Sequence, residues 1–359
     1  MSVEVLTDIA SVERLLPEWR GLASSAARSP LEAPDWLLPL AQGYLGGHGV
    51  RFLTWRADGQ LRGVAPLSLI ANRPPLRPLR QLAWWGTVGP RMRGLVDIVA
   101  AEDARAEVLD SLCEWLRRER QWDVLRLLRP QFASSTPARL RDEARRAGWT
   151  YAGYTNLRST TYQLDLPASV EEWERFLRPK SRSTARREAR QFAEDRGGEL
   201  IAALPAGELA AGLDGVERLL RQRWGADEVY FSADPGFRGL AHEAVPRLAE
   251  QGAAWISVAR DQAGIHACLV STAQNGYAMA LLVAATDADA YRKYSLGKHV
   301  FKMGIGEAVA RGCHTYDFLW VGGYKESFWH AQPRLLESAF IGRGVVGRLM
   351  APVLARRDT

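Results

Sequence analysis

Cysteine is scarce in this sequence, and histidine never stands at the spacing of a metal site. The three cysteines, Cys113, Cys268 and Cys313, are widely separated and lie among apolar residues, which is typical of reduced core thiols. Such a set excludes the disulfide framework on which many small secreted proteins depend. None of the six histidines pairs with another at ligand spacing, and neither HExxH nor CxxC occurs. We therefore expect no metal cofactor.

Long apolar runs are also missing. No window approaches the roughly eighteen uninterrupted apolar residues that a membrane-spanning helix needs. The first residues, MSVEVLTDIASVE, lack the basic and then apolar pattern of a signal peptide. These absences predict a protein without a membrane span, and we expect to find it in the cytoplasm.

A covalent nucleophile is not evident either. No GxSxG elbow is present, and the apolar neighbours of Cys268 and Cys313 indicate core thiols although each has a histidine nearby in sequence. If the protein transfers a chemical group, the sequence favours direct attack between two bound substrates.

The chain is long and apolar enough to bury a large core. Of its 359 residues, 47% are hydrophobic and 25% are charged, which suits two soluble domains. Paired apolar runs predict two β-hairpins, one turning at Asp58 and Gly59 and the other at residues 261–264. Asn275 and Gly276 predict a further turn into a third strand.

The two halves of the sequence follow the same order of elements. A helix expected from Ala104 to Arg120 leads into the strand WDVLRLL, and one expected from Gly297 to Arg311 leads into TYDFLW. This likeness places Asp123 and Asp317 in equivalent positions and indicates two copies of one mixed α/β unit.

We accordingly expect an α/β fold of mixed α+β character. Two tandem units, residues 1–157 and 158–359, would each form a mixed, largely antiparallel sheet flanked by helices. The first unit has no counterpart of the segment YSLGKH, so we expect it to be non-catalytic.

The stretch from Tyr291 to Lys302 contains a candidate anion site. A helix that opens around Ser295, with Ser295 as its N-cap and Gly312 as its stop, leaves its first N–H groups unpaired at the positive end of the helix dipole. A diphosphate fits such a place. The candidate donor-binding residues are Arg292, Lys293, Ser295, Leu296, Gly297 and Lys298. An ordinary turn with solvated lysines is the open alternative.

A basic segment runs from Arg175 to Arg190. It has seven basic residues and one acidic residue, Glu188, so as a helix it would present a surface suited to phosphate or nucleic acid. The candidate substrate contacts in it are Lys180, Arg182 and Arg186. A solvated helix face at a domain junction would give the same pattern.

These motifs resemble the GNAT family of acyltransferases. Residues 294–297 nearly match a Tyr-Ser-Pro-Gly turn, and residues 316–318 give a Tyr-Asp-Phe strand that is followed by a Tyr-Lys pair and an aromatic residue. The nearest branch is that of bacterial cellulose-biosynthesis and Fem-like peptidoglycan-bridge proteins, over residues 158–341. The sequence departs from it where Leu296 replaces proline, which leaves the turn less rigid, and in the spacing between Lys325 and Trp329.

Amide formation from a thioester needs a binding site for the donor, a group that deprotonates or orients the amine, and stabilisation of developing charge. Asp317 is the candidate base or amine-orienting carboxylate, although a capping role in the fold explains it equally well. Tyr324 is a candidate proton donor to the leaving group. The resemblance implies that Lys325 serves the donor's phosphate, as in Fem-like enzymes, or the oxyanion.

Thirteen tryptophans are many for this length, and most are expected in the core. Trp320 and Trp329 bracket the Tyr-Lys pair and are the candidates for an acceptor pocket. The GxGxxG pattern at Gly342, Gly344 and Gly347 lacks the acidic residue that a dinucleotide site needs about twenty positions on. We interpret it as a flexible connection to a terminal helix.

Three functions are consistent with these features. The first is an N-acyltransferase that carries an acyl group from acyl-CoA to a small amine such as an amino sugar, an amino acid or a specialised metabolite. The second is a Fem-like transferase that takes its aminoacyl group from aminoacyl-tRNA, with the basic segment as a phosphate-binding surface. No long heptad run marks the Fem-like coiled-coil arm. The third is a non-catalytic binding protein that keeps the fold.

Overall fold

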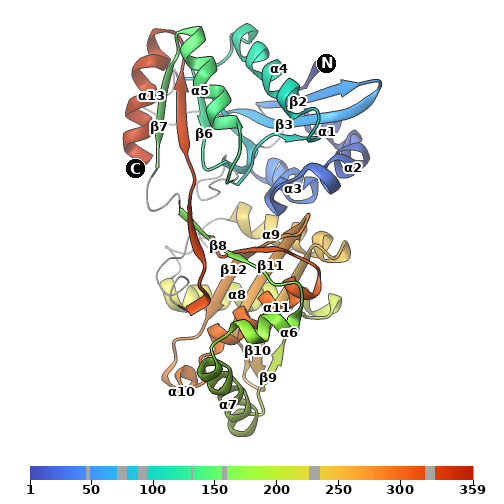
Figure 1. Cartoon of the computed structure of the whole chain (residues 1–359), viewed down its shortest axis with the longest axis vertical. Helices are drawn as coiled ribbons and strands as arrows, with labels where there is room; N and C mark the ends of the chain where they lie inside the picture. The colour runs from blue at the N-terminus through green and yellow to red at the C-terminus, as the bar shows by residue number, and fades with distance from the viewer. Residues whose placement is uncertain are drawn as a thin grey trace. The chain divides into compact units, whose positions relative to one another are not determined.

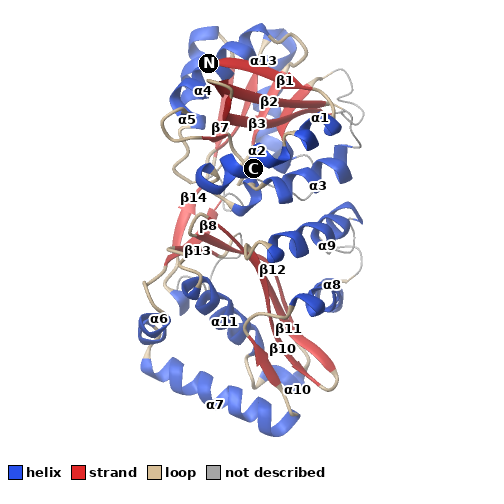
Figure 2. Cartoon of the chain, turned by 90° about the vertical axis from the view of Figure 1, so that its right-hand side faces the viewer, coloured by secondary structure: helices blue, strands red, loops and turns tan. Residues whose placement is uncertain are grey.

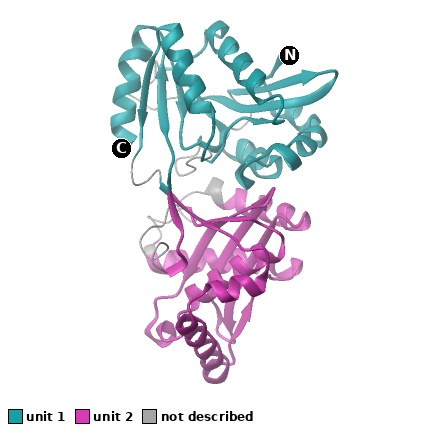
Figure 3. Cartoon of the chain, in the orientation of Figure 1, with its two compact units in different colours: residues 1–160, 334–359 teal, residues 161–333 magenta. Residues whose placement is uncertain are grey.

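The chain divides into two compact units in the computed structural model (Figure 3). Unit 1 comprises Met1–Thr160 and Arg334–Thr359, and unit 2 comprises Thr161–Pro333. The residues that the structure describes are 1–45, 49–70, 79–87, 95–130, 132–155, 160–225, 235–319 and 328–358.

Unit 1 is built on a mixed sheet with the strand order β1-β2-β3-β4-β6-β15-β7, in which β5 also pairs with β3. Its strands are β1 (Ser2–Leu6), β2 (Val50–Ala57), β3 (Gln60–Ile70), β4 (Gln81–Trp84), β5 (Val99–Ala100), β6 (Val124–Leu127), β7 (Thr150–Tyr154) and β15 (Ser338–Gly342). Its α-helices are α1 (Ile9–Arg14), α2 (Leu16–Ala26), α3 (Pro34–Leu45), α4 (Arg105–Arg118), α5 (Thr136–Ala147) and α13 (Gly344–Asp358). In Figure 1, α13 packs along β15 and β7, and Phe340, Ala351 and Ala355 share an apolar cluster there.

Unit 2 has a second mixed sheet with the order β14-β8-β13-β12-β11-β10-β9. The strands are β8 (Thr160–Asp165), β9 (Glu199–Ile201), β10 (Ala254–Asp261), β11 (Gly264–Gln274), β12 (Tyr277–Ala285), β13 (Thr315–Asp317) and β14 (Gln332–Leu335). The α-helices are α6 (Val170–Phe176), α7 (Pro179–Arg196), α8 (Leu209–Trp224), α9 (Pro235–Glu250), α10 (Asp289–Arg292) and α11 (Leu296–Ala310). Figure 2 shows α6, α7 and α11 on one side of this sheet and α8 and α9 on the other.

The hairpin turns form where the sequence predicts them. Asp58 and Gly59 join β2 to β3 with φ of 50° and 77°, and Asn275 and Gly276 join β11 to β12 with φ of 48° and 76°. Two successive positive φ angles favour a turn whose twist matches that of the flanking strands, and Asp, Asn and Gly adopt such angles most readily.

The two units repeat one topology, as predicted. In β2-β3-β4-β6 and in β10-β11-β12-β13, the first two pairings are antiparallel and the last is parallel. The predicted equivalence of Asp123 and Asp317 is wrong, however. Asp123 precedes β6 and pairs with Arg80 at 2.7 Å, whereas Asp317 is the last residue of β13 and is fully buried. Asp123 therefore lies just before the start of its strand and Asp317 at the end of its strand, so the two positions are not equivalent.

The last segment of the chain belongs to unit 1, which differs from the expected division into residues 1–157 and 158–359. Strand β15 lies between β6 and β7 and is antiparallel to both. The interpretation of the GxGxxG pattern as a flexible connection is also wrong. A Cβ on Gly342 would lie 1.9 Å from the carbonyl oxygen of Gly347, and a Cβ on Gly347 would lie 2.0 Å from that of Asp123. The glycines therefore let α13 pack tightly against the sheet.

Helix α11 is close to its predicted extent and covers the core of unit 2. It ends at Ala310, and Gly312 follows with φ of 74°, a conformation that favours glycine after a helix. A Cβ on Gly304 would lie 2.6 Å from Cδ2 of Leu269, so glycine at this position lets the helix lie directly on β11. Among the helices described in either unit, none combines the length and the apolar character required to cross a bilayer.

Candidate active site

The N-terminus of α11 forms the candidate donor-binding turn. Ser295 has φ of 51° and occupies the predicted N-cap position. Its side chain makes no capping hydrogen bond to the helix, so that part of the prediction is wrong. Its hydroxyl instead donates to Oε1 of Glu188 on α7, at 3.2 Å. The amides of Lys298 and His299 bond to the Ser295 carbonyl, whereas no described residue accepts a hydrogen bond from the amides of Leu296 or Gly297. Two N–H donors thus remain at the positive end of the helix.

An open pocket of about 300 Å³ lies against this turn. Its lining includes the predicted donor-binding residues Arg292, Ser295, Leu296, Gly297 and Lys298. Lys293 is not among them, because its ammonium pairs with Asp195 at 2.6 Å and lies over the ring of Tyr294. The turn therefore brings together five of the six predicted residues in a cationic pocket that suits a diphosphate.

Strands β12 and β13 pair over only three residues beside the same helix. They pair only from Tyr277 to Met279, opposite residues 315–317, and β12 then continues to Ala285 along β11. Within the described residues, the second half of β12 has no strand on its β13 side. A backbone edge exposed in this way can hydrogen-bond an extended ligand.

Asp317 ends β13 and is fully buried. Its carboxylate accepts hydrogen bonds from the hydroxyl of Tyr277, from the side-chain amide of Gln163 at 3.2 Å and from the backbone N–H of Leu319 at 2.7 Å. Burial raises its pKa above the ordinary range, and these donors oppose that rise. The bond to Leu319 is the loop cap that the sequence left open as an alternative, and Asp317 lines none of the pockets at α11.

A second pocket, of about 270 Å³, lies between α7 and the first turns of α11. Lys180, a predicted substrate contact, lines it together with Lys298, which it shares with the donor pocket. Phe328 and Trp329 contribute aromatic lining, and the Lys298 ammonium lies 5.1 Å from the centre of the Phe328 ring. We call this space the α7/α11 pocket.

Sequence reasoning did not assign a role to His299 or Glu188. His299 lines the α7/α11 pocket and a neighbouring pocket of about 400 Å³. Burial lowers the pKa of His299 to about 4, with smaller contributions from Lys302 and Lys298, so the imidazole is neutral near pH 7. Its Nε2 lies 3.8 Å from Oε2 of Glu188, which is too far for a hydrogen bond. A single histidine on a helix face carries no pattern that would reveal this setting.

Trp329, Arg186 and Arg182 are the remaining predicted site residues in the described part of the structure. Trp329 is 1% exposed and stacks on Trp173 with ring centres 5.8 Å apart, so it packs in the core and lines the α7/α11 pocket. Arg186 lines the neighbouring pocket and lies 3.8 Å from Glu174, while Arg182 lines neither pocket. The positions of Trp320, Tyr324 and Lys325 lie outside the described residues.

The cysteines are unsuited to nucleophilic catalysis. All three are free and buried, as predicted. Burial raises the pKa of Cys113 to about 11 and raises the pKa values of Cys268 and Cys313 as well. Because the thiolate is the reactive form, these side chains are inert near neutral pH.

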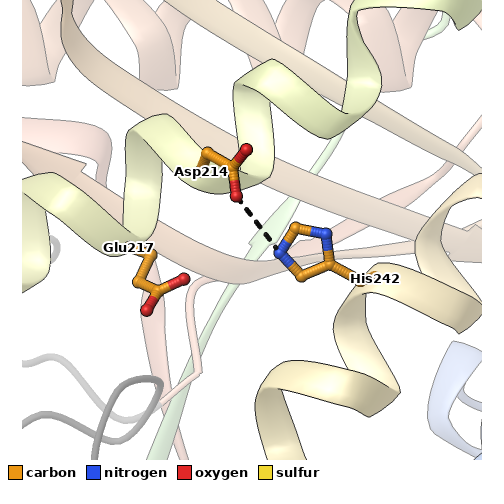
Figure 4. A group of neighbouring side chains, drawn as sticks. All are labelled: Asp214, Glu217 and His242. Atoms are coloured by element: carbon orange, nitrogen blue, oxygen red, sulfur yellow. Dashed lines mark ion pairs between the residues drawn. The ribbon is translucent and has the colours of Figure 1, made fainter.

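Asp214, Glu217 and His242 come close enough to share a ligand where α8 meets α9 (Figure 4). Glu217 already pairs with Arg221 at 2.5 Å and with Arg238 at 2.7 Å. These guanidinium groups neutralise the carboxylate that a cation would need, so the group is explained as an ion-pair network between two helices.

A family model described as an acetyltransferase (GNAT) domain matches residues 179–331. Residues 179–331 form a GNAT domain. The match spans α7, the α11 turn and β13, and it places the chain among the acyltransferases. The resemblance inferred from the residues around Ser295 and Asp317 is thereby confirmed, as is the class of enzyme.

Solved structures extend the likeness beyond the GNAT domain. FemX is 13% identical with a TM-score of 0.63, over 94% of this chain and 97% of FemX. The C-terminal domain of a putative lysylphosphatidylglycerol synthetase from Agrobacterium fabrum is 11% identical with a TM-score of 0.54, over 95% and 96% of the two chains. L-PGS from Bacillus licheniformis is 13% identical with a TM-score of 0.51, over 96% of each chain. At such identities the likeness shows the fold alone. No curated protein matches the sequence significantly.

Proposed function

We propose that the protein is an N-acyltransferase that uses acyl-CoA as its donor and a small amine as its acceptor. The observation that carries this proposal is the α11 turn, where the unpartnered amides of Leu296 and Gly297 meet Arg292 and Lys298 in one open pocket. The diphosphate of coenzyme A supplies the negative charge that this arrangement suits.

The short pairing of β12 with β13 supports the same donor. After Met279, the edge of β12 that faces β13 is free of strand partners among the described residues. An extended pantetheine arm carries amide groups that can bond to such an edge, which would lead the thioester away from the diphosphate into unit 2.

The transfer is proposed as direct attack of the amine on the thioester carbonyl. The C–N bond forms as the C–S bond breaks, the amine proton passes to a base, and the sulfur leaves as a thiol after protonation. Buried thiols with raised pKa values make a covalent cysteine intermediate unfavourable. Tyr324 as proton donor to the sulfur and Lys325 as partner of the oxyanion or phosphate remain predictions, and so does Asp317 as the base.

Aminoacyl-tRNA is the second candidate donor. The observation that favours it is the surface of α7, where Lys180, Arg186 and Arg187 are exposed on one helix next to the α11 turn. Such a surface suits an RNA backbone. The fold shared with FemX is compatible with either donor.

The test is a donor screen on the purified full chain. Calorimetry with acetyl-CoA and longer acyl-CoA thioesters, beside a charged tRNA, should show binding of a CoA thioester. Mass spectrometry of mixtures with amino acids and amino sugars should then show the N-acylated product. Binding without any transfer across the acceptor panel would favour a non-catalytic binding protein, and binding of charged tRNA alone would favour the second donor.

A further inference from the structure

Helix α13 distributes its apolar side chains in an unusual way. It packs along β15 and β7 (Figure 1), and its buried positions are Gly347, Ala351 and Ala355, which recur every four residues. A helix on the surface of a soluble domain ordinarily turns its large apolar side chains inward and its polar side chains outward. In α13 the buried stripe consists of the smallest residues, so several larger apolar residues lie on the opposite face.

Four large apolar side chains are exposed on that outer face. Val345 is 78% exposed, Val346 53%, Leu349 69% and Val353 40%. Because helix residues four apart lie one above the other, Val345, Leu349 and Val353 form a ridge, with Val346 beside it. We call these four residues the α13 ridge. They make up half of the large hydrophobic side chains that are exposed among the described residues, and apolar exposure concentrated in this way marks a contact surface.

The same helix carries an excess of positive charge. Arg348, Arg356 and Arg357 are exposed, and neither Arg348 nor Arg357 forms a hydrogen bond or ion pair with any described residue. The acidic residue of the helix, Asp358, accepts a hydrogen bond from the hydroxyl of Tyr154 on β7. The ridge is therefore bordered by arginines whose charge the helix itself does not neutralise.

This basic border continues onto α5. A Cβ on Gly148 would lie 3.6 Å from Nη2 of Arg348, which places that guanidinium beside the C-terminus of α5. Arg145 and Arg146 are exposed in the last turn of α5. Both also form ion pairs within that helix, at 3.5 Å and 3.4 Å, and exposed pairs of this kind contribute little. An apolar ridge with cationic neighbours on two helices is the result.

A bilayer that contains anionic lipids matches this combination. Apolar side chains of an interfacial helix insert at the level of the headgroups, while arginines beside them attract the lipid phosphates. Because Val345 and Leu349 protrude from the molecule, the fluid headgroup layer can accommodate them without a preformed groove. A second copy of the chain fits less well, since pairing two such helices would bring their arginines together.

We propose that α13 is an interfacial helix that docks the protein onto an anionic lipid surface. The α13 ridge enters the headgroup region, and Arg348 and Arg357 contact lipid phosphates. The helix lies on the bilayer and does not cross it. This inference does not depend on the identity of the donor, because α13 belongs to unit 1 and the donor turn to unit 2.

The experiment measures binding of the full chain to vesicles by sedimentation. Vesicles of phosphatidylcholine alone are compared with an equimolar mixture of phosphatidylcholine and phosphatidylglycerol. The wild type should bind the mixed vesicles at least about tenfold more tightly. The double variant Val345→Ser with Leu349→Ser keeps every charge and should bind the mixed vesicles at least about tenfold more weakly than the wild type. Val170→Ser with Leu335→Ser removes the same two side-chain types from exposed positions outside the helix, and it should bind as the wild type does.

A labelled variant reports insertion directly, even if the serine variant folds poorly. The three native cysteines are buried, so Leu349→Cys supplies an accessible thiol for an environment-sensitive dye. The emission of the dye should shift to shorter wavelength with mixed vesicles. The same dye on Leu335→Cys should show no shift.

Three results would overturn the inference. The first is a wild type that does not bind mixed vesicles or a dye on Leu349→Cys that does not respond to them. The second is vesicle binding that the serine variant leaves unchanged, which would assign the binding to exposed basic residues elsewhere, such as those of α7. The third is a wild type that is dimeric in analytical ultracentrifugation and becomes monomeric as the serine variant, without binding vesicles. That result would assign the ridge to a second copy of the chain.

Discussion

The hydroxyl of Tyr277 donates a hydrogen bond to the buried carboxylate of Asp317, and this contact joins the first residue of β12 to the last residue of β13. Gln163 on β8 donates to the same oxygen from the other neighbouring strand. The carboxylate thus connects three strands at the end of the paired segment of β12 and β13. Its hydrogen bonds cross-link β8, β12 and β13 at that point.

We predict that Asp317→Ala lowers the free energy of unfolding by about 2–4 kcal/mol, because the hydroxyl of Tyr277 and the amides of Gln163 and Leu319 lose their acceptor in the interior. Urea unfolding followed by tryptophan fluorescence measures the change. Tyr277→Phe removes one donor only and should cost about 1 kcal/mol. Loss of turnover without loss of stability in Asp317→Ala would contradict the structural role and support Asp317 as the base.

Gly297→Glu should abolish binding of acyl-CoA. A side chain at this position starts 3.4 Å from Cβ of Ala285 and must turn into the donor pocket, where its charge repels the diphosphate. Calorimetry measures the affinity, and Gly207→Glu is the control, since a Cβ there meets nothing within 4 Å. Wild-type affinity in Gly297→Glu would place the donor elsewhere.

The buried imidazole of His299 predicts acid sensitivity of unit 2. In the unfolded chain this histidine takes up a proton near its ordinary pKa of 6.5, whereas in the folded chain burial holds the pKa at about 4. Stability is therefore complete above pH 6.5 and falls as the pH drops towards 4, by up to about 1.4 kcal/mol per pH unit. The charged neighbours are Glu188, Lys298 and Lys302.

Replacing this histidine should flatten that dependence. Chemical unfolding of His299→Gln between pH 4 and pH 7 should show a smaller loss of stability than the wild type. The exposed His314 provides the control, because His314→Gln should keep the wild-type slope. An unchanged slope in His299→Gln would show that the imidazole is not held neutral.

Charge reversal on α7 separates the two donor classes. Changing Arg182, Arg186 and Arg187 to glutamate should leave the affinity for acyl-CoA within about twofold at moderate salt, since these residues do not line the α7/α11 pocket. If charged tRNA is the donor, its affinity should fall steeply, and its salt dependence should weaken by about 0.7–0.9 in logarithmic slope for each phosphate that the variant no longer neutralises. Reversal of Arg118, Arg145 and Arg357, exposed residues of unit 1, gives the same change in net charge as a control.

Local patterns predicted the parts of the fold that local physics determines. The turns at Asp58 and Asn275 and the stop after α11 follow from backbone conformations that few residues adopt. The donor turn was predicted because serine, glycine and lysine before an apolar helical stripe favour a turn that leads into the N-terminus of a helix. The role of Ser295 was not predicted, because its partner Glu188 lies on another helix.

Long-range arrangements could not be predicted from the sequence for the same reason. Nothing near Phe340 indicates that β15 pairs with strands some two hundred positions earlier. The glycine pattern at Gly342 and Gly347 was interpreted as a flexible connection. Only the folded structure shows that a side chain at either position would collide with the backbone. The setting of His299 depends on the packing of α7 against α11, which no spacing along either helix reveals.

The insertion of β15 between β6 and β7 gives the chain an unusual order of completion during synthesis. Everything in unit 2 leaves the ribosome before the strand that closes the sheet of unit 1. A nascent chain that stops after Pro333 would present two unpaired strand edges to its neighbours, a situation that invites aggregation. Strands β6 and β7 are thus made long before the strand that completes their hydrogen bonding.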